Sequence, residues 1–407
     1  MGKQIAVIVL IFLITTCGWI ILGTSVVVRS ESADSGLSKG VQANWGSPQQ
    51  QSPPSAVATH IEPRVEQESV NGVVTTKTTK ETVTTPLQIE QSRIRVALDL
   101  EQRQKGLLWF ATYRVAFHGA YVFRNSTPSD QVTIKLVFPA PDAIYDDLVV
   151  RADGQPLALT TENGAVSGVV RRPPGAPIRL EVGYRSQGLG TWDYKLGENV
   201  SQVRDFVMQM TTNFDAIDFP EGGLSPTMKT KSAHGWLLTW KYSDLVTGNR
   251  IGMVMPEKLQ PGPLAARISF FAPVSLLFFF FLIFIITTLR GIDLHPMHYF
   301  FLATSFFAFH LLLAYLVDHI SIHAAFVICS TVSIFLVVSY LRIVIGPRFA
   351  FVEAALTQFI YLVLFSYAFF LKGFTGLSIT IGAIITLFVV MQLTARIDWR
   401  RPEGNEA

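Results

Sequence analysis

The chain has 407 residues, of which 49% are hydrophobic and only 15% are charged, and its mean hydropathy is +0.36. This composition excludes an ordinary soluble protein and predicts membrane-spanning segments. The formal net charge of +3 at pH 7 is too small to indicate a nucleic-acid partner. The two cysteines, Cys17 and Cys329, lie in separate apolar runs, so the sequence excludes a disulfide framework.

The first apolar run extends from Ile5 to Val28 and follows a short polar head. Such a run is a cleaved signal peptide, a lipoprotein signal with Cys17 as its lipid acceptor, or an uncleaved anchor. The run continues about ten residues beyond Cys17, which is longer than a signal-peptide core needs. Thr16 also stands where a lipoprotein signal usually carries a smaller residue. We therefore predict an N-terminal transmembrane anchor over residues 1–28.

Residues 29–87 are rich in Ser, Gln, Pro and Thr and show no hydrophobic period. A segment of this composition does not bury enough apolar surface to offset the entropy lost on ordering. We therefore expect a flexible linker or stalk. Within it, the Thr-rich run Val73–Pro86 is β-branched, and it either begins a strand or extends the stalk.

Alternation of apolar and polar residues predicts a β-rich external domain over residues 88–267. A period of two places successive side chains on opposite faces of a strand, as expected where one face lies on a core. Eight or more short strands without an amphipathic helix between them favour an antiparallel β-sandwich, and its length is sufficient for a core of its own. The alternating runs are Ile94–Leu100, Tyr113–Phe117, Val132–Phe138, Ile178–Tyr184, Phe206–Met210 and Trp236–Tyr242.

The segment from Asn213 to Thr230 carries three carboxylates, Asp215, Asp218 and Glu221, and predicts a structured loop. Carboxylates at this spacing are able to bind Ca²⁺ or to act in acid–base catalysis. The alternative is a solvated connection whose acids cap turns, and we prefer it. The sequence contains no Walker-type loop, no Gly-x-Ser-x-Gly elbow and no His-Glu-x-x-His helix. We therefore expect no enzymatic activity, catalytic residue, cofactor or metal.

Five apolar runs follow one another between Ile268 and Leu393, with very short polar interruptions. Each run is about 18 to 22 residues long, which at a rise of about 1.5 Å per residue crosses a ~30 Å hydrocarbon core. Residues 268–395 are thus predicted to form a five-helix transmembrane bundle, which gives six spans with the anchor. A tail follows at residues 396–407. The first run ends at Arg290, and the others cover roughly residues 298–317, 324–341, 350–371 and 374–394.

The short loops between the spans carry an asymmetric charge. If the N-terminus lies inside, seven basic residues fall on the cytoplasmic side, whereas Lys372 alone falls on the other. The positive-inside rule then predicts that both termini are cytoplasmic and that the segment between the anchor and the bundle is external. The seven basic residues are Lys3, Arg290, Arg342, Arg348, Arg396, Arg400 and Arg401.

Several motifs resemble the CreD family of bacterial inner-membrane proteins. Asp293-Leu294-His295-Pro296-Met297-His298-Tyr299 resembles the Leu-His-Pro-x-Gln-Tyr turn that begins a span in the family. Asp318-His319 at the outer end of that span resembles a Ser-Glu-His sequence, and Tyr340-Leu341-Arg342 closes the next span. Leu393–Trp399 is similar to a terminal Thr-Arg-x-Ile-Asp-Trp motif. Gln102–Gly106, before the Tyr113 strand, is similar to the start of the external domain.

This resemblance covers most of residues 101–400 and implies a multi-pass inner-membrane protein linked to cell-envelope integrity. The family is controlled by a sensor-kinase and regulator pair that responds to carbon source or β-lactam damage, and it has no established reaction. The expected role is non-enzymatic: the external β-domain contacts an envelope protein or the cell wall while the bundle, embedded in the bilayer, anchors or signals. The alternative is a transporter or channel, but an inverted repeat is absent and intramembrane charges are few.

Ionisable residues within membrane helices are candidate functional residues because burying them is costly. His310 lies in the middle of a span, where it is either a proton relay or a neutral imidazole bonded to a neighbouring helix. We prefer the neutral interpretation. Glu353 lies one turn inside its span, where it is able to pair with Arg348 or to reach the interface, and we prefer interfacial anchoring.

His295 and His298 have the His-x-x-His spacing that allows two rings to bind one metal. Pro296 between them is predicted to begin a helix, with Asp293 near its N-terminus, so we prefer a capping role. Asp318 and His319 lie in the next turn, at the predicted external face. The adjacent carboxylate favours a charged imidazolium, so this pair is the strongest candidate for a pH-sensitive contact, one that docks the external β-domain onto the bundle. The alternative is that the two residues only cap helix ends.

Overall fold

The structure, a computed structural model, describes residues 2–70, 73–106, 108–162, 164–197 and 201–395. The chain divides into two compact units. The helical unit comprises Met1–Gly36, Gly106–Leu108 and Leu259–Ala407, and the β unit comprises Leu37–Lys105 and Trp109–Lys258. The predicted tail at residues 396–407, with its three arginines, lies outside the described residues.

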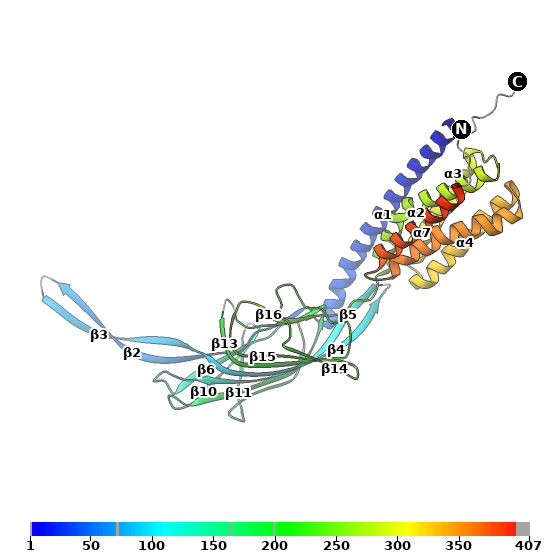
Figure 1. Ribbon diagram of the computed structural model, residues 1–407. Coiled ribbons are helices and arrows are strands. Elements are labelled where there is room, and N and C mark those ends of the chain that lie inside the picture. The colour runs from blue at the N-terminus through cyan, green and yellow to red at the C-terminus, as the bar shows by residue number, and fades with distance from the viewer. Residues whose placement is uncertain (1, 71–72, 107, 163, 198–200, 396–407) are drawn as a thin grey trace, which may run out of the picture. The chain divides into compact units, whose positions relative to one another are not determined.

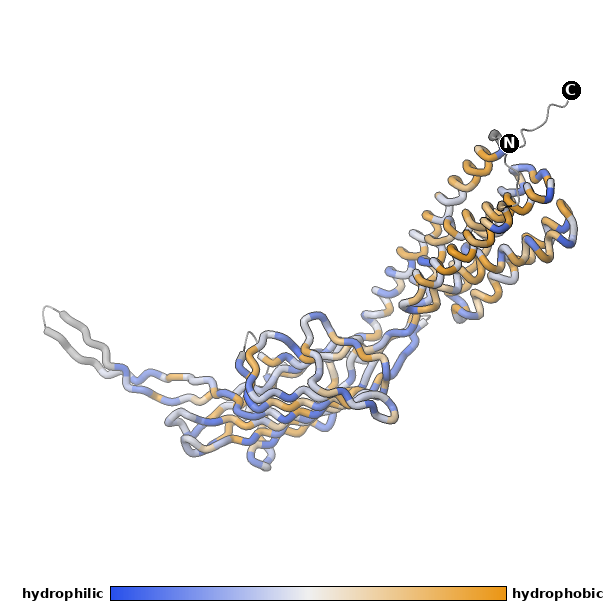
Figure 2. Tube along the Cα trace, viewed as in Figure 1, coloured by the Kyte–Doolittle hydropathy of each residue, from blue (hydrophilic) through white to orange (hydrophobic). Residues whose placement is uncertain are grey.

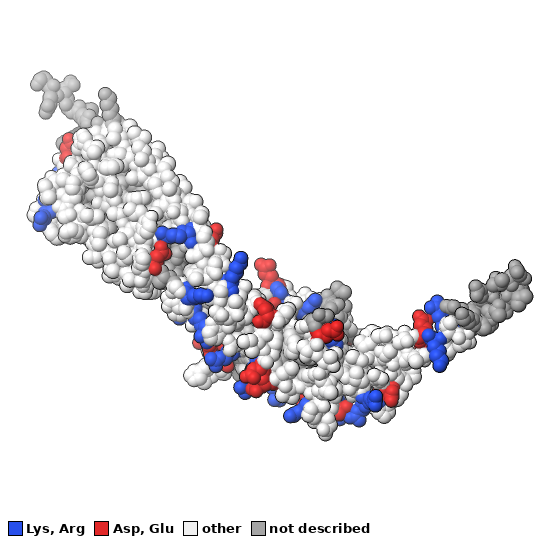
Figure 3. Space-filling view, turned by 180° about the vertical axis from the view of Figure 1, so that it is seen from behind, with Lys and Arg blue, Asp and Glu red and all other residues white. Residues whose placement is uncertain are grey.

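The helical unit contains six helical segments that are long and apolar enough to span a membrane. Hydrophobic residues predominate along these helices, except toward the C-terminal end of the first one (Figure 2), and charged residues on the visible surface of this unit gather toward the helix ends (Figure 3). Both features are expected of helices surrounded by lipid. The predicted N-terminal apolar helix and five C-terminal apolar helices are confirmed, which gives six candidate spans. The segments are α1 (Gly2–Trp45), α2 (Pro261–Leu289), α3 (Pro296–Leu316), α4 (Ile322–Val344), the segment Phe349–Phe370 and α7 (Thr375–Thr394).

The segment Phe349–Phe370 is helical throughout, but only part of it is an α-helix. Two stretches of it are π-helical. π-Helical stretches are rare in proteins, and they are frequently found at functional sites. The segment consists of the π-helical stretches η1 (Phe349–Ala354) and η2 (Phe359–Leu364), the α-helical turns α5 (Ala355–Gln358) and α6 (Phe365–Tyr367), and the terminal 3-10 turn η3 (Ala368–Phe370).

Aromatic and small side chains pack the helices of this unit against one another. Phe279 of α2 lies against Phe306 of α3, with ring centroids 4.6 Å apart. Trp19 of α1 is fully buried and lies 5.7 Å from the Phe307 ring of α3. Such close contacts stabilise helix association in lipid, where the hydrophobic effect gives little drive for helices to associate.

The β unit contains three sheets that share one hydrophobic core. Its strands are β1 (Gln49–Gln51), β2 (Ser55–Val70), β3 (Val73–Leu87), β4 (Ile89–Lys105), β5 (Leu108–Arg124), β6 (Gln131–Val137), β7 (Tyr145–Ala152), β8 (Gln155–Pro156), β9 (Thr160–Glu162), β10 (Ala165–Arg171), β11 (Pro177–Leu189), β12 (Thr191–Lys195), β13 (Ser201–Thr212), β14 (Met228–Ser232), β15 (Gly235–Thr247) and β16 (Arg250–Val254). The largest sheet has the order β14-β15-β13-β4-β5-β11-β7-β8. The five-stranded sheet has the order β3-β2-β6-β10-β9, and β1-β12-β16 form the third.

The alternating runs in the sequence coincide with strands β4, β5, β6, β11, β13 and β15. In β6, Val132, Ile134 and Leu136 are each no more than 2% exposed, and the residues between them face outward. Residues of both larger sheets meet in the common core, as in a sandwich. Most pairs are antiparallel, but β4 pairs with β13, and β1 with β12, in parallel.

The structure differs from the flexible linker expected over residues 29–87. Helix α1 continues past the predicted anchor to Trp45, and β2 and β3 form an antiparallel hairpin (Figure 1), so the run Val73–Pro86 lies in a strand. Ala56 and Ala58 of β2 are at most 1% exposed and join the core beside β6. The composition hides this strand because small alanines are buried without forming a long apolar run.

Candidate functional site

Arg29, Tyr315 and Asp318 form a polar cluster beside the C-terminal end of α3, here called the Arg29 cluster. Asp318 Oδ2 lies 3.1 Å from Arg29 Nη2, and the guanidinium carbon lies 5.0 Å from the centre of the Tyr315 ring. The same Nη2 donates to the carbonyl oxygen of Ala314. The last carbonyl groups of a helix have no partner within it, so a cation here satisfies one of them and interacts favourably with the helix dipole. The cluster thereby fixes α1 on α3.

The turn between α3 and α4 explains why Asp318 and His319 lie at the surface. Helix α3 ends at Leu316, and Ser321 already caps α4 by accepting a hydrogen bond from the backbone of Ala324. The side chains of Asp318 and Arg29 are 45% and 39% exposed. Solvent screening limits an ion pair at such a site to about 0.2–1 kcal/mol.

Asp318, which was expected to act together with the neighbouring His319, has another partner in the structure. The carboxylate of Asp318 binds Arg29 of α1, and the side chain of His319 is exposed. Arg29 was missing from the predicted site, although the sequence contained a signal for it. Arg29 follows one apolar run and Asp318 follows another, at the same predicted face of the membrane and with opposite charge. Opposite charges at one interface are natural partners.

Asp293, His295 and His298, for which a capping role was preferred to metal binding, have structural roles at the start of α3. Gln4 of α1 donates from Nε2 to Asp293 Oδ1 over 3.5 Å. His295 is the N-cap of α3, and its Nδ1 accepts from the backbone N–H of Met297. His298 Nδ1 lies 2.6 Å from the Tyr340 hydroxyl of α4. Because the two histidine rings are 6.4 Å apart and use Nδ1 elsewhere, they do not converge on one point.

His310 is fully buried between α1 and α3. Its Nδ1 lies 2.9 Å from the carbonyl oxygen of Phe306, one turn earlier in the same helix. A carbonyl oxygen only accepts, so Nδ1 carries the proton and Nε2 has a free lone pair. Nδ1 therefore bonds within its own helix and not, as was expected, to a neighbouring helix. His310 contacts α1 by packing edge-on against the ring of Trp19, with ring centroids 5.6 Å apart.

Glu353 of η1 pairs with Arg290 at the end of α2, and not with Arg348, the partner that the sequence offered as an alternative. The Glu353 side chain is only 14% exposed, whereas that of Arg290 is 45% exposed. The second carboxylate oxygen of Glu353 is buried without a hydrogen-bond partner among the residues that the structure describes. Among the ion pairs described in the helical unit, this one has the least exposed carboxylate, which makes the two residues a candidate functional pair.

Two further polar links join the Phe349–Phe370 segment to its neighbours. Gln358 donates from Nε2 to Ser333 Oγ of α4 over 2.8 Å, and Ser333 in turn donates to the Ser305 carbonyl oxygen of α3. The Tyr361 hydroxyl donates to Thr386 Oγ1 of α7 over 2.8 Å. In an apolar surrounding, such bonds satisfy side chains that would otherwise be costly to bury.

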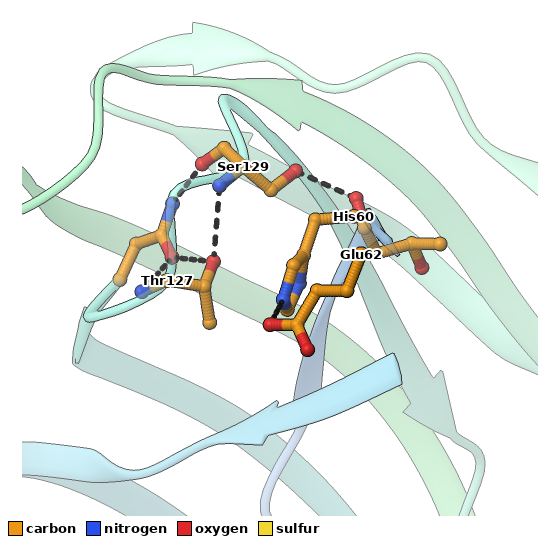
Figure 4. Close-up of polar contacts among 6 residues, drawn as sticks. His60, Glu62, Thr127 and Ser129 are labelled. Carbon is orange, nitrogen blue, oxygen red and sulfur yellow. Dashed lines mark hydrogen bonds and ion pairs between the residues drawn. The ribbon is translucent and has the colours of Figure 1, made fainter. Parts of the chain in front are cut away.

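In the β unit, a polar cluster lies between β2 and the loop before β6 (Figure 4). His60 Nε2 lies 2.8 Å from Glu62 Oε1, and Ser129 Oγ donates to the carbonyl oxygen of Thr59 over 2.7 Å. Acid, histidine and serine are the residue types of a hydrolytic triad. Here the serine hydroxyl is directed to a backbone oxygen and not to the histidine, so the nucleophile–base contact of such a triad is not formed. The cluster instead fixes β2 to the adjacent loop.

A layer of buried polar side chains joins β1 to the largest sheet. The Tyr184 hydroxyl donates to Gln51 Oε1 over 2.7 Å, and Gln49 Nε2 donates to Ser186 Oγ over 2.8 Å. Burial raises the pKa of Tyr184 well above its ordinary value. Nearby, burial also raises the pKa of Asp193, although its ion pair with Arg250 at 3.1 Å acts in the opposite direction. These groups are tied into the fold and stay neutral or paired.

The carboxylates of the Asn213–Thr230 loop are used locally. Asp215 pairs with Lys231, and Asp218 Oδ1 accepts from the backbone N–H of Phe219 over 2.9 Å. Among the described residues, no group of three His, Cys, Asp or Glu side chains converges as a metal site would require. The loop is thus a capped connection in the described structure.

Comparison with known proteins finds a family match for part of the chain. The family model for the inner membrane protein CreD matches residues 221–400. No curated protein matches the chain. The resemblance in the sequence is therefore confirmed over this range, which includes the Asp293–Tyr299 motif and all five carboxy-terminal spans.

Solved structures resemble the chain only weakly. A protein from Legionella pneumophila named as a nutrient binding protein gives a TM-score of 0.35 at 9% identity, over 57% of this chain and 76% of that one. An M1 zinc metallopeptidase from Deinococcus radiodurans gives 0.27 at 12% identity, over 42% of each chain. At such scores neither likeness carries an argument about activity. Over residues 221–400, the chain is similar to the CreD family of inner membrane proteins.

Proposed function

We propose that the protein is a non-enzymatic inner-membrane protein that supports cell-envelope integrity. The helical unit anchors it in the membrane, and the β unit binds a periplasmic protein or a component of the cell wall. The observation that carries this proposal is the combination of a CreD-type set of spans with a β unit that has a core of its own. A self-contained domain tethered to a membrane is suited to contacting a partner in the adjoining compartment.

The β2–β3 hairpin is the part of the β unit best suited to bind that partner. Strand β2 pairs with β6 only over Ser55–Ala58, whereas it pairs with β3 from Ala56 to Val70. The hairpin therefore continues well beyond the sheet to which it belongs (Figure 1). A projecting hairpin gains little stability from its own unit, which favours a role in recognition.

Site-specific photocrosslinking in the source bacterium tests this role. A photoreactive residue at Thr82 or Thr84 of β3 is expected to crosslink an envelope component. Thr160 of β9 is the matched control, because it is also an exposed threonine and lies on the opposite edge of the same sheet. Equal yields at both edges, or no adduct at either, would contradict the proposed binding surface.

A deletion provides a second test of the same proposal. Cells whose protein lacks residues 59–84 are expected to lose resistance of the envelope to detergent.

We propose that the protein is oriented in the membrane with both termini in the cytoplasm. The basic residues support this orientation. Arg290, Arg342 and Arg348 lie at helix ends on the same side of the helical unit as the start of α1, whereas Lys372 lies at the opposite ends of the helices. Cysteines introduced at Arg348 and Lys372 test it in intact cells. Labelling of position 372 but not of position 348 by an impermeant reagent is expected, and the reverse pattern would overturn the orientation.

A transport pathway finds less support. The interfaces between α2 and α3 are filled by aromatic rings such as Phe279 and Phe306, both at most 1% exposed. A pathway through the helices would require polar residues that line a continuous opening.

A further inference from the structure

A cleft of about 670 Å³ lies in the helical unit between α2, the Phe349–Phe370 segment and α7. This volume falls within the range of pockets that hold small molecules. Nearly all of the lining is apolar, with Glu353 toward one end and Thr357, Tyr361 and Thr386 further along. The cleft follows the helical segment from Val352 to Ala368. At a rise of about 1.5 Å per residue this length exceeds 20 Å, more than one leaflet of a ~30 Å hydrocarbon core.

Helix α7 closes one side of this cleft through a narrow contact. Of the residues of α7, only Thr386 and Val390 are buried. The contact is made where Thr386 binds Tyr361 and where Gly382 approaches Phe365, so closely that an added Cβ would lie 2.6 Å from the ring. Beside this line of contact the helices do not fill the space between them, and the cleft remains.

The two π-helical stretches of the segment both face this cleft. Val352 and Glu353 of η1, and Ile360, Tyr361 and Leu364 of η2, are among its lining residues. A π-helical stretch shifts side chains around the helix relative to an α-helix and is seldom retained without a functional reason. Here the half-buried carboxylate of Glu353 and the Tyr361 hydroxyl, which is bonded to α7, both belong to the lining of the cleft.

Among the lining residues that the structure describes, charge lies toward one end of the cleft. Arg290 pairs with Glu353 there and keeps a guanidinium that is 45% exposed, while Glu353 keeps one oxygen without a partner among the described residues. A long apolar channel with adjacent positive and negative groups at one end is complementary to an amphiphile with an apolar chain and a zwitterionic head. Bilayer lipids have this form.

We propose that the cleft binds a phospholipid with a phosphoethanolamine head group. One acyl chain lies in the cleft, the phosphate binds Arg290, and the primary ammonium donates to Glu353. An anionic lipid would gain the arginine contact but would meet the negative charge of Glu353. A choline head group carries no N–H and cannot donate to the carboxylate. The ion pair thus selects for a zwitterion that has a primary amine.

Lipid binding to the full-length protein in detergent tests the proposal. The protein is stripped of lipid and titrated with phosphatidylethanolamine, phosphatidylcholine or phosphatidylglycerol, and the retained lipid is counted by native mass spectrometry. The ethanolamine lipid is expected to bind about tenfold more tightly than the other two, the difference that one charge-assisted hydrogen bond supplies. In Glu353→Gln this preference is expected to disappear while some binding of all three lipids remains.

A matched pair of variants on α7 locates the site. Ile381 lines the cleft and Ile384 does not, yet the two side chains are 49% and 62% exposed. Ile381→Trp is expected to reduce binding of all three lipids about tenfold, and Ile384→Trp is expected to leave binding unchanged. The same elution profile for both variants shows that neither has unfolded.

Three outcomes would overturn the proposal. Equal retention of the three lipids by the unmodified protein would mean that the cleft is filled by the bilayer without selection. Unchanged binding in Ile381→Trp would place the lipid elsewhere on the protein. A dimer that lipid dissolves and that Ile381→Trp abolishes would identify a second copy of α7 as the occupant.

Discussion

The helical unit and the β unit reverse the relation between polarity and burial. In the helical unit, Leu277 and Phe335 are 53% and 68% exposed, whereas His310 and Gln358 are completely buried. In the β unit, core positions such as Trp192 and Trp240 are buried, and charged residues are scattered over the visible surface (Figure 3). The difference follows from the surrounding medium, because lipid accepts apolar side chains and water does not. The two units of one chain are therefore stabilised by different combinations of forces.

The β unit depends on the hydrophobic effect, since its core is removed from water on folding. The helical unit gains little from moving apolar groups between lipid and protein. Its specificity comes from ring packing and from a few polar links, such as the Tyr361–Thr386 hydrogen bond. Deletions and substitutions in each unit test this difference between the two units.

The largest effect is expected from deleting the strands that precede residue 88. A fragment of residues 37–258 contains the whole β unit and is expected to unfold cooperatively in circular dichroism. A fragment of residues 88–262 retains every strand predicted from alternation, but it loses the Gln51–Tyr184 hydrogen bond and the buried Ala56 and Ala58. We expect this shorter fragment to lose its fixed tertiary structure. A cooperative transition in it would show that β1 and β2 are dispensable.

A pair of tryptophan substitutions compares the two cores directly. Trp192 of β12 and Trp19 of α1 are both 0% exposed. Trp192→Ala is expected to lower the free energy of unfolding of the β unit by about 3–5 kcal/mol, as large-to-small changes do in a water-surrounded core. Trp19→Ala is expected to cost only about 1–2 kcal/mol, because lipid replaces part of the lost contact.

Denaturant unfolding of the full chain in detergent, with limited proteolysis as a separate reporter for each unit, measures both values. Trp19→Phe and Trp192→Phe serve as controls that keep an aromatic ring. Equal losses for the two alanine variants would contradict the distinction between the cores.

Much of this fold could be predicted from the sequence because the decisive signals are local. Six spans follow from apolar length, and strands such as β6 and β11 follow from strict alternation. The parallel pairing of β4 with β13 could not be predicted, because it joins segments far apart in the chain and leaves no local mark. The helical end of α1 was missed because its polar residues, at about 29–45, resemble a linker in composition.

The candidate site was predicted less well for the same reason. Asp318, His295 and His298 were singled out correctly as polar residues at helix ends, but their partners Arg29, Met297 and Tyr340 are set by helix packing or capping. Glu353 was recognised as unusual, yet its pairing with Arg290 depends on how α2 lies beside η1. Sequence spacing predicts which side chains need a partner, and the packing of helices decides which partner they find.

The third prediction compares the two ion pairs that join helices. Arg290–Glu353 includes a carboxylate that is only 14% exposed, whereas both members of Arg29–Asp318 are more than a third exposed. A double-mutant cycle with Arg290→Gln and Glu353→Gln is expected to give a coupling energy of about 1.5–3 kcal/mol. The cycle with Arg29→Gln and Asp318→Asn is expected to give about 0.2–1 kcal/mol, and to fall further at high salt. Equal coupling energies would show that burial does not separate the two pairs.

The smallest effect concerns the pH dependence of the β unit. Burial raises the pKa of Asp193 above its ordinary value, and the ion pair with Arg250 opposes this only in part. The folded state therefore binds a proton more readily at Asp193 than the unfolded chain does. Between the unfolded pKa, about 3.9, and the higher folded pKa, the contribution of this group to stability falls as the pH rises.

Asp205 provides the opposite case within the same unit. Its pKa is lowered by hydrogen bonds from Gln91 and Arg93, so its contribution is present above the unfolded pKa and is lost as the pH falls. The stability of Asp193→Asn relative to the unmodified fragment of residues 37–258 should therefore increase from pH 4 upward and then level off. For Asp205→Asn the relative stability should decrease over the range below pH 4 as the pH rises. Urea unfolding of the three proteins at pH 3 to 7 measures both slopes. Parallel curves for Asp193→Asn and the unmodified fragment would mean that this carboxylate does not titrate differently in the folded and unfolded states.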